Sequence, residues 1–122
     1  MKVLVVDDSL IMRKILVNIL KEKKVPESSI LDASDGQAAL EILNTDTVDL
    51  LLVDWNMPKM NGLELVRVLR KMEKYKKLPI IMITSEAAKY NVLEAVKAGV
   101  TDYIVKPISG ITVMQKLKNY IK

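Results

Sequence analysis

Two residue types that often carry catalysis and metal binding are missing, because the 122-residue chain contains no cysteine and no histidine. Without cysteine there are no disulfides, no thiolate metal sites and no cysteine nucleophiles. Without histidine, the usual zinc sites, Ser-His and Cys-His hydrolases, and an imidazole general base within the chain are excluded. Many common enzyme mechanisms are therefore excluded for this chain.

Long hydrophobic runs are missing too, since each apolar run is short and falls well below the ~20 residues that cross a bilayer. Met1-Lys2 leads directly into a predicted strand, so we expect no signal peptide, no membrane segment and a cytoplasmic protein. Hydrophobic residues make up 50% of the chain, which supplies a core well. A length of 122 residues suits one domain, and we expect residues 1–122 to form it.

The charge balance is basic, with 19 Lys and Arg against 15 Asp and Glu, for a net charge of +4. The lysines gather in patches such as residues 21–24 and 71–77. No aromatic or arginine-rich nucleic-acid reader accompanies these patches, so they are better explained as solvated ends of amphipathic helices. We expect no nucleic-acid partner.

Five short apolar segments alternate with patterns of helical period. The predicted strands cover residues 3–6, 30–33, 50–53, 80–83 and 103–105. Ser9 is the predicted N-cap of the first helix, and Gly99 the stop of the fourth. The predicted inward faces of the five helices are Met12, Ile15, Leu16, Ile19 and Leu20; Ala39, Leu40 and Leu43; Leu65, Val66, Leu69 and Met72; Ala88, Val92, Ala95 and Val96; and Val113, Leu117 and Ile121.

The alternation of strands and helices predicts an α/β domain. Short links imply right-handed crossovers and a parallel sheet covered on both faces. The strands beginning at Val3, Leu50 and Ile80 are unbroken apolar runs and should be central, while those near Ile30 and Tyr103 carry acids in or beside them and should be edges. The strand order 2-1-3-4-5 satisfies both conditions, which predicts a flavodoxin-like, doubly wound (βα)5 fold in a single domain.

Acidic residues follow two of the central strands. Asp7 and Asp8 come after the first strand and Asp54 after the third, and ligands of such sheets bind between these two strand ends. Thr84 and Lys106 should reach the same crevice from strands four and five. Two carboxylates ~5 Å apart repel by ~3 kcal/mol at an effective dielectric constant near 20, so three call for a cation or a raised pKa. Oxygen ligands suit magnesium, manganese or calcium.

Each of these residues, taken alone, also has a simpler explanation. Asp7 or Asp8 could cap a helix, Asp54 could begin a turn, Thr84 could be an N-cap, and Lys106 could be solvated. One cap, however, accounts for one carboxylate and leaves two unpaired. A carboxylate nucleophile beside a divalent metal, with an ammonium and a hydroxyl nearby, suits phosphoryl capture. Since no P-loop glycine pattern is present, we expect another molecule, not ATP, to donate the phosphoryl group.

These features resemble the receiver domains of two-component response regulators, and the resemblance covers essentially the whole chain. It rests on Asp7-Asp8, Asp54 with Met57-Pro58 and Gly62, Thr84, Tyr103 and Lys106-Pro107. The resemblance implies that Asp54 accepts a phosphoryl group from the phosphohistidine of a histidine kinase. It further implies that Asp8, Asp54 and the main-chain carbonyl of Asn56 hold Mg²⁺, for which Mn²⁺ can substitute, and that Asp7 supports the ion through water.

The resemblance also assigns roles at the other strand ends. Lys106 would contact the phosphoryl oxygens, Thr84 would donate its hydroxyl to one of them, and Tyr103 would be the switching aromatic. A cis peptide bond before Pro107 is implied as well. We expect exchange of Asn56 or Glu86, which border the site, to change phosphoryl lifetime, although Glu86 is equally explained as an acid in a first helical turn.

Finer features resemble the chemotaxis branch of the family. They are Ser9 to Arg13, residues 54–58, Glu86-Ala87 and Ala98-Gly99, while Ile108 stands where that branch often carries Phe. The resemblance implies a monomer that is no enzyme beyond its own phosphorylation and autodephosphorylation. Its output surface would be helix four, strand five and helix five. The target would be a protein such as the flagellar motor switch, and a phosphatase is a further partner that the branch suggests.

Other functions fit the sequence less well. A haloacid-dehalogenase-type aspartyl phosphatase would want an acid where Asn56 stands, and it normally needs a substrate cap. A flavodoxin would want a hydroxyl-rich phosphate loop, and Asp7-Asp8 would repel the flavin phosphate. A single-domain receiver that acts as a phosphate sink, in a relay outside chemotaxis, or as a scaffold without phosphorylation remains as an alternative.

Overall fold

The structure is a computed structural model that describes residues 1–121. Five parallel strands form one sheet in the order β2-β1-β3-β4-β5. Their bounds are β1 Val3–Val6, β2 Ile30–Ala33, β3 Leu50–Val53, β4 Ile80–Thr84 and β5 Asp102–Val105. The predicted strand order, with β2 and β5 at the edges, is confirmed, and so is the doubly wound flavodoxin-like fold.

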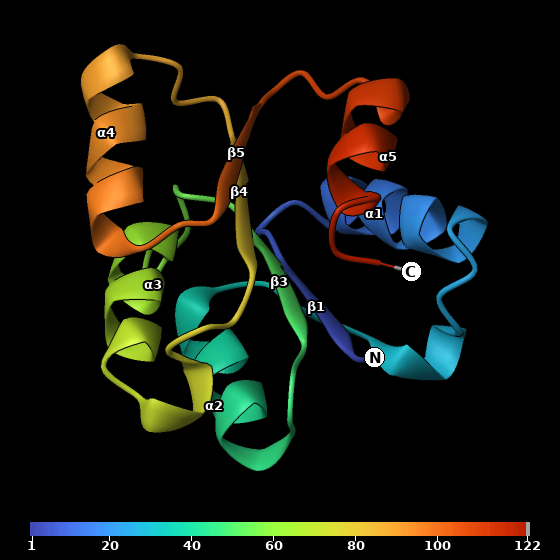
Figure 1. The fold of residues 1–122 in the computed structure, drawn as a ribbon, viewed down its shortest axis with the longest axis horizontal. Coiled ribbons are helices and arrows are strands. Elements are labelled where there is room, and N and C mark those ends of the chain that lie inside the picture. Colours follow the sequence, from blue (N-terminus) through green and yellow to red (C-terminus); the bar gives the residue numbers. More distant parts are fainter. Residues whose placement is uncertain (122) are drawn as a thin grey trace.

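Five helices connect the strands and cover both faces of the sheet (Figure 1). Helices α1 and α5 lie on one face, and α2, α3 and α4 lie on the other. The helices are α1 Leu10–Glu22, α2 Gly36–Thr45, α3 Gly62–Arg70, α4 Lys89–Ala98 and α5 Gly110–Leu117, with short 3-10 turns at Glu27–Ser29 and Glu73–Tyr75. No helix within residues 1–121 combines the length and apolar composition that a transmembrane segment requires.

The side chains of the central strands pack into two separate cores, one on each face of the sheet, because successive side chains of a strand point to opposite faces. In β1, Val3 and Val5 pack beneath α1 and α5, whereas Leu4 and Val6 pack beneath α2 and α3. Every residue of β1, β3 and β4 is buried. This two-sided burial is the physical reason why their sequences are unbroken apolar runs instead of alternating ones.

Local signals set where several helices begin and end. The Ser9 hydroxyl accepts a hydrogen bond from the Met12 N–H at 3.2 Å, which confirms the predicted N-cap of α1. Asn61 and Glu64 form a reciprocal capping box at the start of α3. Gly99 ends α4 in the left-handed conformation with φ of 110°, as predicted from its position.

The prediction that Ile15, Ala88 and Val96 face inward is wrong. Ile15 is 40% exposed because it lies at the margin of the α1 stripe that Leu16 and Ile19 bury. Ala88 is exposed because it precedes the first turn of α4, and Val96 is 58% exposed. Ala95 is the buried residue of α4, so its neighbour Val96, about 100° further around the helix, faces outward.

Candidate functional site

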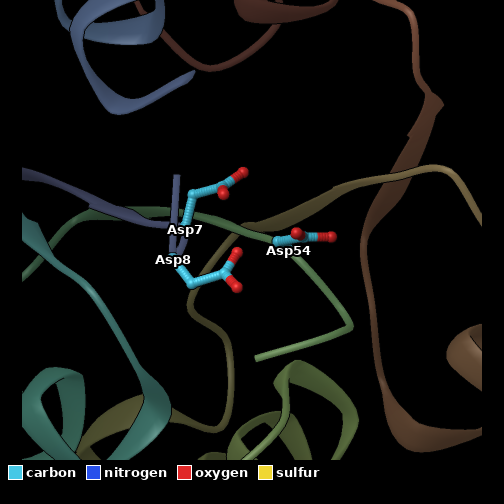
Figure 2. Close-up of side chains that lie close together, drawn as sticks. All are labelled: Asp7, Asp8 and Asp54. Carbon is cyan, nitrogen blue, oxygen red and sulfur yellow. The ribbon is translucent and has the colours of Figure 1, made fainter. Parts of the chain in front are cut away.

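Three carboxylates gather where β1 and β3 end (Figure 2). Asp7 and Asp8 directly follow β1 and Asp54 directly follows β3, so the pairing of Val6 with Val53 brings them side by side. One carboxylate oxygen of each lies within 4.8 Å of the others. Asp7 and Asp54 are buried, and Asp8 is exposed. The predicted convergence of these acids at one end of the sheet is confirmed.

Every polar group of Asp7 takes part in a hydrogen bond. Its N–H donates to Ala33 O at 3.1 Å, continuing the ladder between β1 and β2. Its Oδ1 accepts from the Ser9 N–H at 2.9 Å, and its Oδ2 accepts from Lys106 Nζ at 2.9 Å. Its main-chain carbonyl accepts from Arg13 Nη1 at 2.6 Å. The buried carboxylate therefore has both a charge partner and a fixed orientation.

Lys106 brings the positive charge of the site from the end of β5. Its Nζ lies 2.9 Å from Asp7 Oδ2 and 3.2 Å from Asp54 Oδ2, and its side chain is 19% exposed. Burial disfavours the ammonium form, but the hydrogen bond with Asp7 and the negative charges of Asp54 and Asp7 together raise the pKa of Lys106. The Lys106-Pro107 peptide bond is cis, as the resemblance implies.

The charges at the site do not balance. Three carboxylates face one ammonium, which leaves an excess of two negative charges when all four groups are ionised. All the nearby anionic ligands are oxygens, which is the donor set that hard divalent cations prefer. The residues present therefore fit a magnesium-type ion, and no histidine or cysteine competes for a softer metal.

Thr84 and Tyr103 meet at the main chain of Glu86, just after β4. The fully buried Thr84 hydroxyl accepts from the Glu86 N–H at 3.4 Å, and within residues 1–121 it makes no hydrogen bond to Asp54. The Tyr103 hydroxyl donates to the carbonyl oxygen of Glu86. Burial, followed by the charges of Glu86 and Asp54, raises the pKa of Tyr103 to about 12. The two predicted switch residues are thus joined through one peptide segment.

The side chain of Glu86 links the loop after Asp54 to α4. Its carboxylate accepts from Asn56 Nδ2 at 3.1 Å through one oxygen and from Asn91 Nδ2 at 3.3 Å through the other. The structure therefore brings Asn56 and Glu86 together, as expected for two residues that border one site. Asn91 was missed, because an amide in the first turn of a helix carries no signal for such a contact.

Two glycines allow close main-chain contacts with the segment between β3 and α3, and Gly62 is the one that lies against Asp54. The Gly62 N–H donates to Trp55 O at 2.8 Å, and a Cβ at Gly62 would lie 2.0 Å from the carbonyl oxygen of Asp54. The Gly36 N–H donates to Met60 O at 3.1 Å, and a Cβ there would lie 2.4 Å from that oxygen. Sequence reasoning missed Gly36, whose contact with Met60 joins segments far apart in the chain.

Comparison with known proteins agrees with this geometry. A family model for the response regulator receiver domain matches residues 3–118. The chain is 48% identical to the chemotaxis protein CheY1 of Helicobacter pylori, covering 97% of this chain and 94% of that protein. It is 45% identical to a CheY homolog of Campylobacter jejuni, covering 99% and 92%. The solved structure of the chemotaxis response regulator CheY4 of Vibrio cholerae superposes with a TM-score of 0.89 at 33% identity, covering 98% and 97%.

The chain therefore belongs to the response regulator receiver domain family, and it is a signalling switch that operates through phosphorylation. Within that family it is CheY-like, since its chemotaxis relatives match nearly the whole chain.

Proposed function

We propose that Asp54 accepts the phosphoryl group from the phosphohistidine of a partner histidine kinase. A bond forms between an Asp54 carboxylate oxygen and phosphorus as the phosphorus–nitrogen bond breaks, and the kinase imidazole leaves. The observation that carries this proposal is the buried Asp54 carboxylate, which lies 3.2 Å from Lys106 and beside Asp7 and Asp8. Lys106 would neutralise charge on the transferring group, which is the main requirement of phosphoryl transfer.

Receiver domains bind Mg²⁺ at an acidic pocket, and the cluster of Asp7, Asp8 and Asp54 fits that ion. We assign Asp8, Asp54 and the main-chain carbonyl of Asn56 to the ion, with Asp7 supporting it through water and Mn²⁺ able to substitute. A bound divalent cation would supply electrostatic stabilisation of the phosphoryl oxygens during transfer.

Phosphorylation would change the chain through Thr84. The modified Asp54 gains about one negative charge and new acceptor oxygens, which Lys106 and the Thr84 hydroxyl would share. Thr84 would then release the Glu86 N–H, and because Glu86 also accepts from Tyr103, movement of this segment would reposition the tyrosine. Moving an equilibrium from 1:99 to 99:1 takes about 5.5 kcal/mol. Hydrogen bonds to charged groups contribute about 1.5–3 kcal/mol each, so two to four suffice.

The output surface in this proposal is the face formed by α4, β5 and α5. Tyr90 of α4 and Val105 of β5 are exposed there by 70% and 42%, which supplies apolar contacts for a protein partner. Because the relatives are named as chemotaxis proteins, we propose a flagellar motor switch protein as that partner. We further propose that residues 1–122 form one domain, which acts as a monomer in the cytoplasm. Asn56 and Glu86 would set the rate of autodephosphorylation, with a phosphatase as an additional regulator.

Intact-mass measurement tests the phosphoacceptor. Wild-type protein incubated with Mg²⁺ and acetyl phosphate should gain the mass of one phosphoryl group, and chelation of Mg²⁺ should abolish the gain. Asp54→Asn should gain none, whereas Asp46→Asn, which removes an acid that pairs with Lys2 instead, should behave as wild type. Equal gain in Asp54→Asn would show that another residue is phosphorylated. No gain in the wild type would refute the proposed function.

Rotational switching of flagella tests the output. Expression of the chain in motile cells that lack their own CheY should restore switching if the motor is the target. The same cells expressing Asp54→Asn should stay unswitched. Failure of the wild type to restore switching, despite phosphorylation in vitro, would point to the phosphate-sink or relay alternatives.

A further inference from the structure

Asp8 is the one acid of the three whose side chain has no partner within residues 1–121. Asp7 is bonded to Ser9 and Lys106, and Asp54 to Trp55 and Lys106. The exposed Asp8 carboxylate makes neither a hydrogen bond nor an ion pair in that range. Its position relative to the other two carboxylates therefore depends on the main chain that carries it.

That main chain is held by Arg13, which lies in the first turn of α1. The Arg13 Nη1 donates to the main-chain oxygen of Asp7 at 2.6 Å, and that oxygen belongs to the peptide group that joins Asp7 to Asp8. Since a peptide group is planar, holding its oxygen restricts the direction in which the Asp8 Cα leaves it. One guanidinium bond thus sets the starting point of the Asp8 side chain.

Arg13 is itself held in place from the opposite side. Its Nε donates to Asp32 Oδ2 at 3.0 Å, so the guanidinium bridges the end of β1 and the edge strand β2. The Arg13 side chain is only 14% exposed, whereas the Asp32 side chain is 51% exposed. The planar fork of an arginine suits this pair of acceptors, and a lysine could not bond both in the same geometry.

We infer that Arg13 is a positioning residue for the cation site. It orients Asp8 toward Asp54 by holding the peptide group between Asp7 and Asp8, and it touches neither the ion nor the phosphoryl group. This inference rests on the Mg²⁺ site of the proposed function. Residues that orient the ligands of a metal typically change its affinity by about 10–100-fold when mutated.

The charge of Arg13 gives a test, because competing explanations predict opposite changes in Mg²⁺ affinity when Arg13 is replaced. If Arg13 acted through its positive charge alone, removing it would strengthen the binding of a cation, because a nearby repulsion would be lost. If Arg13 positions Asp8, removing it weakens the binding despite that gain. A purely structural role would lower the free energy of unfolding without changing affinity in the folded protein.

Calorimetric titration with Mg²⁺ separates these outcomes. We expect Arg13→Gln to bind Mg²⁺ about 10-fold more weakly than the wild type. Arg13→Lys, which can still donate to the Asp7 carbonyl, should recover part of the loss. Arg67→Gln is the matched control, since it removes the same charge from an exposed pair with Glu94 and should leave the affinity unchanged. Urea unfolding in chelator shows how much of each variant is folded.

Equal or tighter Mg²⁺ binding by folded Arg13→Gln would overturn the inference while leaving the proposed function intact. If Arg67→Gln lost as much Mg²⁺ affinity as Arg13→Gln, the inference would also be overturned, because the change in net charge would then explain both losses. Absence of Mg²⁺ binding by the wild type would overturn the proposed function and this inference together.

Discussion

Replacing Asp54 by Asn should stabilise the folded protein in the absence of metal, although it removes the phosphoacceptor. Asn has nearly the same shape as Asp and keeps an oxygen that can accept from the Trp55 N–H, which bonds Asp54 Oδ1 at 2.7 Å. What the substitution removes is one of three clustered negative charges, of which only Asp7 and Asp54 pair with the Lys106 ammonium. The sign of the effect depends on whether repulsion or attraction is larger at Asp54.

The distances give the magnitude. At an effective dielectric constant of about 20, charges 4.8 Å apart repel by about 3.5 kcal/mol, so Asp7 and Asp8 together oppose Asp54 by about 7 kcal/mol. The attraction of Lys106 at 3.2 Å is about 5 kcal/mol on the same scale. The difference favours Asn by about 2 kcal/mol, and water around the exposed Asp8 reduces it, so we expect a gain of about 1–2 kcal/mol.

Urea unfolding with and without Mg²⁺ is the assay. In chelator, Asp54→Asn should have the higher free energy of unfolding. Mg²⁺ at ten times its dissociation constant should stabilise the wild type by about 1.4 kcal/mol and the variant by less, so that the gap narrows. Asp46→Asn provides the control, because this acid pairs with Lys2 at 2.8 Å far from the cluster. Asp46→Asn should lower the free energy of unfolding by between 0 and about 1 kcal/mol and leave the stabilisation by Mg²⁺ unchanged.

Two results would refute the reasoning. If Asp54→Asn is less stable than the wild type in chelator, the single Lys106 ammonium compensates the cluster and there is no excess repulsion. If Mg²⁺ stabilises the wild type and Asp54→Asn equally, the cation does not bind through Asp54.

Three further predictions concern the rest of the chain. Lys24→Gly should raise the free energy of unfolding by up to about 1 kcal/mol in urea denaturation, because exposed Lys24 has φ of 66°. Relief of this left-handed strain, about 1–2 kcal/mol, exceeds the added entropy of an unfolded glycine, about 0.4–1 kcal/mol, and a net loss of stability would contradict this. Tyr75→Phe should lower the free energy of unfolding by about 1–3 kcal/mol in the same assay, because the buried hydroxyl donates to Leu43 O and Asp46 O; an unchanged free energy would contradict this. Since the folded-state pKa of Tyr103 is raised to about 12, its contribution to stability is complete below about pH 10 and is lost as the pH rises through about 12. Ultraviolet titration of the wild type minus Tyr103→Phe should show this midpoint, and one near 10 would disprove the shift.

Much of the fold could be predicted because its signals are local. Unbroken apolar runs mark strands that are buried on both faces, and the acid in or beside a run marks an edge. In a parallel sheet, all carboxyl ends lie along one side, so chain order alone brings Asp7, Asp8 and Asp54 together. Ser9 and Gly99 were identified from the chemistry of helix caps.

The errors arose where burial depends on neighbours that are distant in sequence. Ile15 and Val96 fit an apolar stripe by spacing, but the width of each buried stripe is set by the elements packed against it, and both residues fall outside. The contact of Gly36 with Met60 likewise joins two loops that only the packing of α2 beside α3 brings together.

The sequence by itself determined the order of the strands, the end of the sheet where the acids meet and the residue types that meet there, because each follows from periodicity and chain direction. Only the tertiary structure decided how these groups are held. The bond from Arg13 to the Asp7 carbonyl, the lack of a partner for Asp8 within residues 1–121, and the meeting of Thr84 and Tyr103 at Glu86 all depend on ångström-scale distances. Such distances come from the packing of helices on the sheet, and no local pattern encodes them.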